Sequence, residues 1–93
     1  MKISKLKESL VHGVFPKKDA MDIIFELFDN KINYHRLKNL SHYERFGKKD
    51  INNEKRIKEL IKSRNSIIKY IMSIRSKEAK IKIYADIKVE IVS

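Results

Sequence analysis

Apolar residues recur at three- and four-residue steps through residues 53–77, which is the spacing of one face of an α-helix. The members of this apolar stripe are Ile57, Leu60, Ile61, Ile67, Ile68, Ile71 and Ile74. Four lysines fall together on the opposite face, namely Lys55, Lys58, Lys62 and Lys69. The segment therefore predicts one long amphipathic helix that buries its isoleucines and carries a cationic stripe on the other side.

A second helix is predicted over residues 16–46. Pro16 suits its first turn, because the missing N–H of proline costs nothing there, and no other Gly or Pro follows before Gly47. Its apolar residues occupy two adjoining arcs, one with Ala20, Ile23, Ile24, Leu27, Tyr34 and His35, the other with Met21, Phe25, Phe28 and Ile32. An arc this wide needs a second surface beyond one neighbouring helix, from a sheet or from another protomer.

Residues 47–52 have the composition of a short turn between these helices. Gly47 is expected to end the first helix, and Asn52 or Asn53 to cap the second. Because the connection is short, the two helices are expected to run antiparallel as a hairpin about 40 Å long, at 1.5 Å rise per residue. A hairpin of that length is elongated for so small a chain, which favours packing against a second copy.

The period changes to two residues at the C-terminal end. Apolar side chains at Ile81, Ile83, Ala85, Ile87, Val89 and Ile91 alternate with Lys80, Lys82, Tyr84, Asp86, Lys88 and Glu90. This alternation predicts a strand over residues 80–91 with one buried face. Its partner is left open among the 10–15 segment, a fold-back near Ala85 and Asp86, and the same strand of a second chain.

Residues 1–15 fit either a strand or an irregular segment, and Gly13 and Pro16 favour the strand over a helix. The expected fold class is therefore α+β and mainly α, with a long antiparallel α-hairpin, a C-terminal β-strand and a short N-terminal strand as one candidate partner. The chain of 93 residues is long enough for one small domain, which we expect to be a homodimer.

Net charge of +10 admits nucleic acid as a partner, because clustered Lys and Arg are the electrostatic footprint of phosphate binding. Two readings of the lysines stay open. One is a solvated face, since isoleucine, lysine and asparagine supply 38 of the 93 residues, as an AT-rich coding sequence would. The other is a sequence-tolerant nucleic-acid or polyanion site formed by the four-lysine stripe, with Lys48 and Lys49 extending it at the turn.

Arg64 lies within the apolar stripe of residues 53–77 and needs a partner. In a hairpin folded about residues 49–50, position 64 faces position 35, which brings Arg64 near Tyr34 and His35. We interpret this group as a polar layer that fixes the register of the helices, with an anion pocket as the alternative. By the same register, Arg75 is expected to lie near Glu26 or Asp22.

Other chemistry finds little support in the sequence. There is no cysteine, and His35 and His42 are two helical turns apart, so no metal site and no cofactor are predicted. Ser41 and His42 are adjacent on a helix and project about 100° apart, so no catalytic arrangement is indicated.

No apolar run approaches the roughly 20 residues that span a bilayer. We therefore expect a soluble cytoplasmic protein without membrane contact. The leading function is a non-enzymatic interaction module, a homodimer that binds a protein partner, and the alternative is sequence-tolerant nucleic-acid binding.

Overall fold

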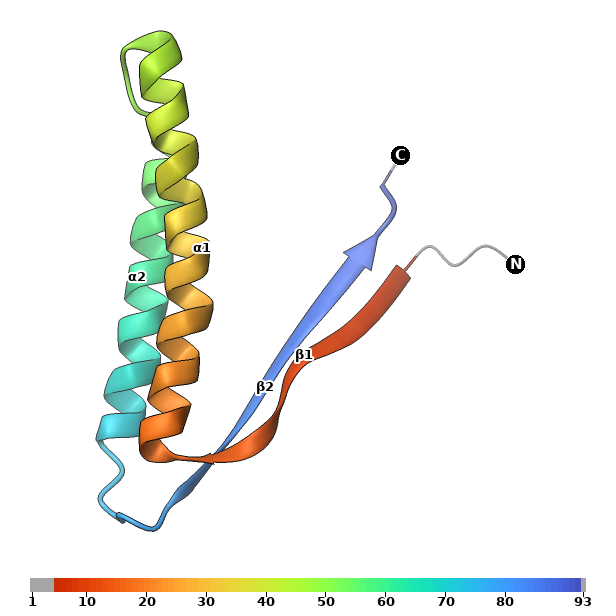
Figure 1. The fold of residues 1–93 in the computed structure, drawn as a ribbon, viewed down its shortest axis with the longest axis vertical. Helices are drawn as coiled ribbons and strands as arrows, with labels where there is room; N and C mark the ends of the chain where they lie inside the picture. Colours follow the sequence, from red (N-terminus) through yellow and green to blue (C-terminus); the bar gives the residue numbers. More distant parts are fainter. Residues whose placement is uncertain (1–4, 93) are drawn as a thin grey trace.

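Two helices and a two-stranded antiparallel sheet make up residues 5–92, the part of the chain that the computed structural model describes (Figure 1). Their order is β1 (Lys5–Pro16), α1 (Lys17–Phe46), α2 (Ile51–Met72) and β2 (Lys80–Glu90). The mainly helical α+β class expected from the two periodicities is confirmed. The first four residues of the predicted 1–15 segment lie outside the described residues.

The bounds of α1 follow from its end residues. Pro16 precedes the first helical residue in an extended conformation, and Asp19 places a negative charge in the first turn, where it complements the helix dipole. Gly47 ends the helix with a φ of 72°, and its N–H donates to the carbonyl oxygen of Tyr43 at 2.7 Å. Only glycine adopts this left-handed conformation without strain, so the expected helix end is confirmed.

The bounds of α2 differ from the prediction at both ends. Asp50 is the N-cap, and its carboxylate accepts hydrogen bonds from the backbone N–H groups of Asn52 and Asn53. The prediction that Asn52 or Asn53 is the cap is therefore wrong, because the carboxylate two residues earlier satisfies the free N–H groups first. The helix also ends five residues earlier than residue 77, at Met72, with Ser73 as its C-cap. Arg75 lies beyond this end and is exposed, so its predicted place on the helix beside Glu26 or Asp22 is wrong.

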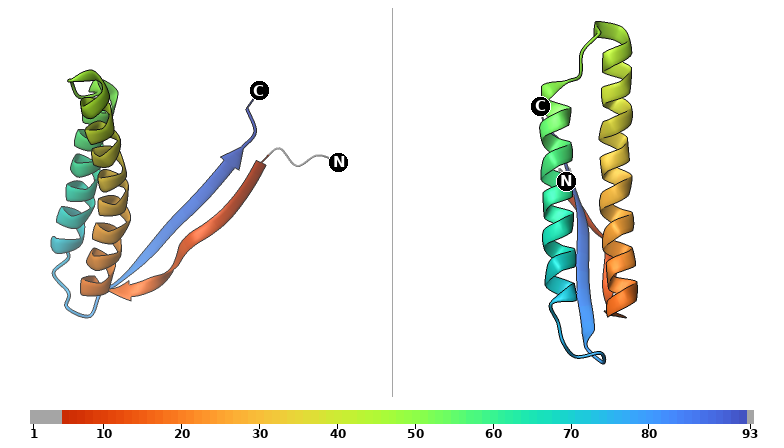
Figure 2. Two further views of the ribbon diagram at one scale, coloured as in Figure 1. Left: turned by 45° about the horizontal axis from the view of Figure 1, so that its top comes forward. Right: turned by 90° about the vertical axis from the view of Figure 1, so that its left-hand side faces the viewer.

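The register of the two helices also departs from the expectation. α1 and α2 lie side by side in opposite directions, and the connection runs back along α1 before α2 begins (Figures 1 and 2). The buried side chain of Asn39 fixes this start, because its Oδ1 accepts from the Asp50 N–H at 3.0 Å and its Nδ2 donates to Glu54 Oε1 at 2.8 Å. The last turns of α1 therefore extend past the start of α2, and a fold about residues 49–50 is wrong.

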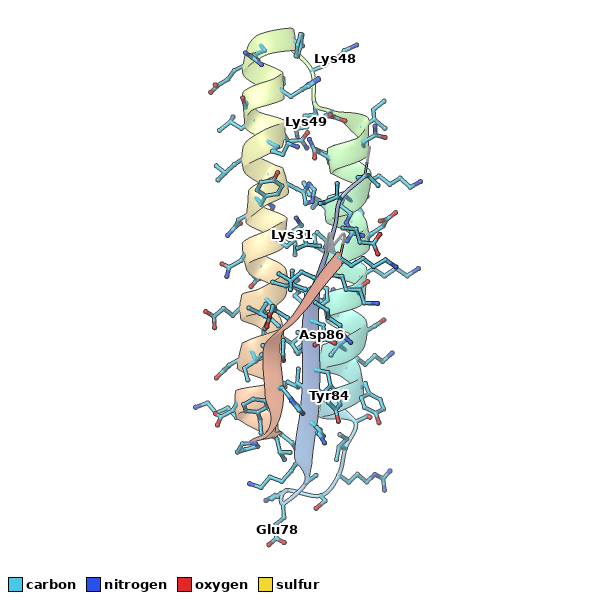
Figure 3. All side chains as sticks on the ribbon, turned by 90° about the vertical axis from the view of Figure 1, so that its right-hand side faces the viewer. Lys31, Lys48, Lys49, Glu78, Tyr84 and Asp86 are labelled. Atoms are coloured by element: carbon cyan, nitrogen blue, oxygen red, sulfur yellow. The ribbon has the colours of Figure 1, made fainter. Side chains whose placement is uncertain are left out.

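β1 and β2 pair along their whole length, so the 10–15 segment is part of the partner strand of residues 80–90. The register pairs Lys5 with Glu90 and Pro16 with Lys80, and a bulge interrupts it between Ser9 and Val11. One face of this ribbon, which we define as β1 with β2, is apolar along β2, as the two-residue period predicts. The other face carries mostly charged and polar side chains, including Tyr84 and Asp86 (Figure 3).

The main core lies where the ribbon meets the hairpin. This vertex core consists of Ala20, Ile24, Ile68, Ile71 and Ile83. A second, smaller cluster of Ile32, Ile57 and Leu60 joins the two helices farther along. From the vertex core the ribbon and the hairpin diverge as the two arms of a V (Figure 1). The Cα extents of 51 × 44 × 14 Å show that this V is one layer thick.

The described residues contain no helix that is both long and apolar enough to cross a lipid bilayer.

Candidate functional site

The lysine stripe on α2 borders a shallow, open groove on the surface of that single helix. Lys58, Lys62 and Lys69 line it together with Ile61, Asn65 and Ser66. Each of these positions has another of the set three or four residues away, so a single regular helix brings them together on one face. Ammonium groups beside an amide and a hydroxyl form a set of hydrogen-bond donors that suits phosphate or carboxylate oxygens.

No acidic side chain offsets the lysines of this groove. The ion pairs within residues 5–92 involve none of Lys55, Lys58, Lys62 and Lys69. Glu59, which follows Lys58 directly in α2, pairs with Arg56 at 3.2 Å. Lys58 and Lys62 are like charges four residues apart, a spacing that disfavours a helix.

The other lysines of the sequence-predicted site lie elsewhere. Lys55 is exposed one turn before Lys58 but does not line the groove. Lys48 and Lys49 lie at the turn end of the hairpin (Figure 3). Lys49 pairs with Glu54 at 3.6 Å and lines a different groove, of about 510 Å³, with Leu40, Tyr43 and Ile57. The structure thus gathers three of the six lysines in one groove.

Arg64 has a partner other than the one expected. Its Nη1 donates to Asp29 Oδ1 at 2.6 Å, and its guanidinium lies 5.6 Å from the centre of the Phe25 ring. Asp29 is six residues before His35, the position predicted to face Arg64. The shift follows from the early start of α2, and six residues of helix correspond to about 9 Å.

His35 forms a separate polar contact near the start of α2, and the ring of Tyr34 lies edge-on to the imidazole. The Nδ1 atom of His35 lies 2.9 Å from Asn53 Oδ1, and its buried Nε2 has no hydrogen-bond partner among the described residues. Tyr34 is half exposed, with the ammonium of Lys31 4.6 Å from its ring centre. Tyr34, His35 and Arg64 therefore do not line one pocket, and the predicted grouping of these three is wrong.

Asn39 is the register-fixing residue that the sequence reasoning missed. It is 5% exposed and joins α1 to the cap and first turn of α2. The sequence spacing indicates its location, because Asn39 follows Ile32 and His35 at steps of three and four residues and so lies on the face toward α2. A polar residue in that row is suited to fixing the register between two helices.

The apolar face of the ribbon is covered only at the vertex. Along β2 the exposed fraction rises from 8% at Ile83 to 48% at Ile87 and 55% at Val89. On β1, Leu6 pairs with Val89 on the same face and is 56% exposed. We call Leu6, Ile87 and Val89 the distal apolar face.

No group of three or more His, Asp or Glu side chains within residues 5–92 is arranged to hold a metal ion. Comparisons with protein families, curated proteins and solved structures find no match for this chain.

Proposed function

We propose that this protein is a non-enzymatic interaction module that acts as a homodimer and binds a protein partner. The ribbon arms supply the contact between the two copies. The helical hairpins remain available to the partner on their outer sides, where the groove lined by Leu40, Tyr43 and Ile57 combines apolar and charged side chains.

The observation that carries this proposal is the accessible surface of the single chain, 8044 Å². A compact monomer of 11.1 kDa exposes about 5,700 Å², so this chain exposes about 2,300 Å² more. Residues 1–4 and 93 lie outside the described part of the chain. If about 160 Å² is subtracted for each of these five residues, the value for an extended chain, a surplus of about 1,500 Å² remains. A standard protein interface buries about 800 Å² of each partner, so the surplus is large enough for a stable dimer.

The dimensions of the chain support the same conclusion. Its Cα radius of gyration is 17.1 Å, whereas a compact domain of 93 residues has about 12 Å. The difference arises from the V, because its two arms touch each other only near the vertex core. A second copy is the partner that is present wherever the protein is present, and it carries the same uncovered face.

Light scattering at low and at high salt tests the homodimer. We expect twice the chain mass at both ionic strengths. Added salt does not weaken the burial of apolar surface, and it screens the repulsion between two chains of charge +10. A mass of one chain at both ionic strengths and at concentrations up to the millimolar range would contradict the proposal.

The lysine groove on α2 supports a second candidate function, sequence-tolerant binding of nucleic acid. Its specific support is the run of lysines without acidic partners described above. In such binding, lysines release condensed counterions from phosphates, so affinity falls steeply with salt.

Replacing Lys58, Lys62 and Lys69 together by glutamine tests that candidate. If each lysine contacts one phosphate, the slope of log K against log salt for a mixed-sequence duplex should become shallower by about 2.7. The matched control replaces Lys80, Lys82 and Lys88, which removes the same charge from the ribbon. Equal weakening by both triple variants, or unchanged binding by the first, would remove the groove as a nucleic-acid site.

A further inference from the structure

We infer that the two copies dock through the distal apolar face, with the ribbon of one chain packed face to face on the ribbon of the other. This inference rests on the proposed homodimer and adds which surface forms it. The alternatives within a homodimer are a contact between hairpins and an extension of the sheet through its edge strands.

The gradient of exposure along the ribbon identifies the uncovered surface. Ile81 and Ile83 on β2 and Val11 and Phe15 on β1 pack against the hairpin. Ile87 and Val89 continue the row of Ile83 at two-residue steps, and Leu6 lies opposite Val89. The same face of one sheet is thus buried at one end and half exposed at the other.

The hairpin of the same chain does not cover this distal part. Phe15 and Ile81 anchor the ribbon at the vertex, and Lys17 Nζ donates a hydrogen bond to the carbonyl oxygen of Ile74 beside it. The β1–α1 junction has no linker, because α1 begins directly after the last residue of β1. The ribbon therefore leaves the vertex at an angle to the hairpin, as the views in Figures 1 and 2 show.

A ribbon of two strands is marginally stable in water and needs a second layer on its apolar face. The opposite face does not serve as a second docking surface, because lysines line it and ion pairs join Lys5 to Glu90 and Lys7 to Asp86 across it. These charged groups remain solvated when the apolar faces of two ribbons meet.

A second copy fits the distal apolar face because the contact is self-complementary. In a two-fold symmetric interface each chain offers the same patch, so an apolar face that fits another such face needs no separate partner surface. Two sheets pack face to face at about 10 Å with their side chains interleaved, and aliphatic side chains such as Leu6, Ile87 and Val89 suit this packing. Glu8 lies opposite Ile87 in the register and therefore on the same face, so each copy brings one carboxylate to the contact on its β1 side.

Single cysteines locate the interface, since the chain contains no cysteine of its own. Ile87→Cys and Val89→Cys place a thiol on the distal apolar face, and Lys88→Cys places one between them on the charged face. A bismaleimide that spans about 10 Å, the separation of face-packed sheets, is added to each variant at micromolar protein concentration.

We expect rapid conversion of Ile87→Cys or Val89→Cys to covalent dimers. Thiols held together within a dimer react at an effective concentration near millimolar, so at about 10 μM protein their cross-linking should exceed that of Lys88→Cys by about 100-fold. The light-scattering mass of each variant without cross-linker shows whether it is still a dimer.

Two results would overturn the inference in different ways. Dimeric variants whose distal cysteines cross-link no faster than Lys88→Cys would place the dimer contact on another surface and leave the homodimer standing. A wild-type chain that is monomeric by light scattering would overturn the homodimer and, with it, this docking mode.

Discussion

Replacing Ile71 by alanine is expected to lower the free energy of unfolding by about 2–5 kcal/mol. Ile71 is 2% exposed and lies in the vertex core, where α1, α2 and β2 meet. Its truncation removes contacts to all three elements and leaves a cavity. Small domains are stable by only about 5–15 kcal/mol, so urea unfolding followed by circular dichroism should show a much lower midpoint.

The adjacent Tyr70 supplies the control for this measurement. It is 70% exposed, and Tyr70→Ala should change the free energy of unfolding by no more than about 0.5 kcal/mol at the same protein concentration. Equal concentrations matter because dissociation of a dimer contributes to its apparent stability. If Ile71→Ala unfolded at the same urea concentration as Tyr70→Ala, the vertex core would not be the junction that holds the V together.

Replacing Ile87 by glutamate is expected to halve the solution mass of the protein. In the proposed dimer this substitution would place a carboxylate directly opposite Glu8 on the contact face, where like-charge repulsion adds to the cost of removing the carboxylate from water. In the single chain Ile87 is half exposed and lies away from the vertex core, so the helical circular dichroism signal should be kept. Light scattering measures the mass.

The neighbouring Lys88 provides the matched substitution. Lys88→Glu introduces the same side chain one residue away on the charged face and should leave the dimer intact. A dimer that survived Ile87→Glu would show that the distal apolar face is not the contact between the copies. Loss of helical signal in Ile87→Glu would show that the ribbon is needed for folding of the single chain.

The site residues divide according to how many elements position them. Lys58, Lys62 and Lys69 share one groove, as the periodicity predicts, because their relative placement depends only on the regular geometry of α2. Lys49 requires the path of the turn as well, and it pairs with Glu54 instead of extending the stripe. The grouping of Arg64 with His35 depends on the register between the two helices. The apolar pattern within each helix does not specify that register.

Periodicity in the sequence is sufficient to identify both helices, the C-terminal strand and the apolar faces of α2 and β2, whereas it leaves residues 1–15 open between a strand and an irregular segment. Periods of 3.6 and two residues, the proline before α1 and the glycine after it are local features, and local backbone geometry is sufficient to read them. The register of the helices depends on the hydrogen bonds of the buried Asn39, which join residues far apart in the chain. The divergence of the ribbon from the hairpin depends on packing at the vertex core. Both depend on contacts between residues far apart in the chain, and a periodic pattern is equally compatible with several such alignments.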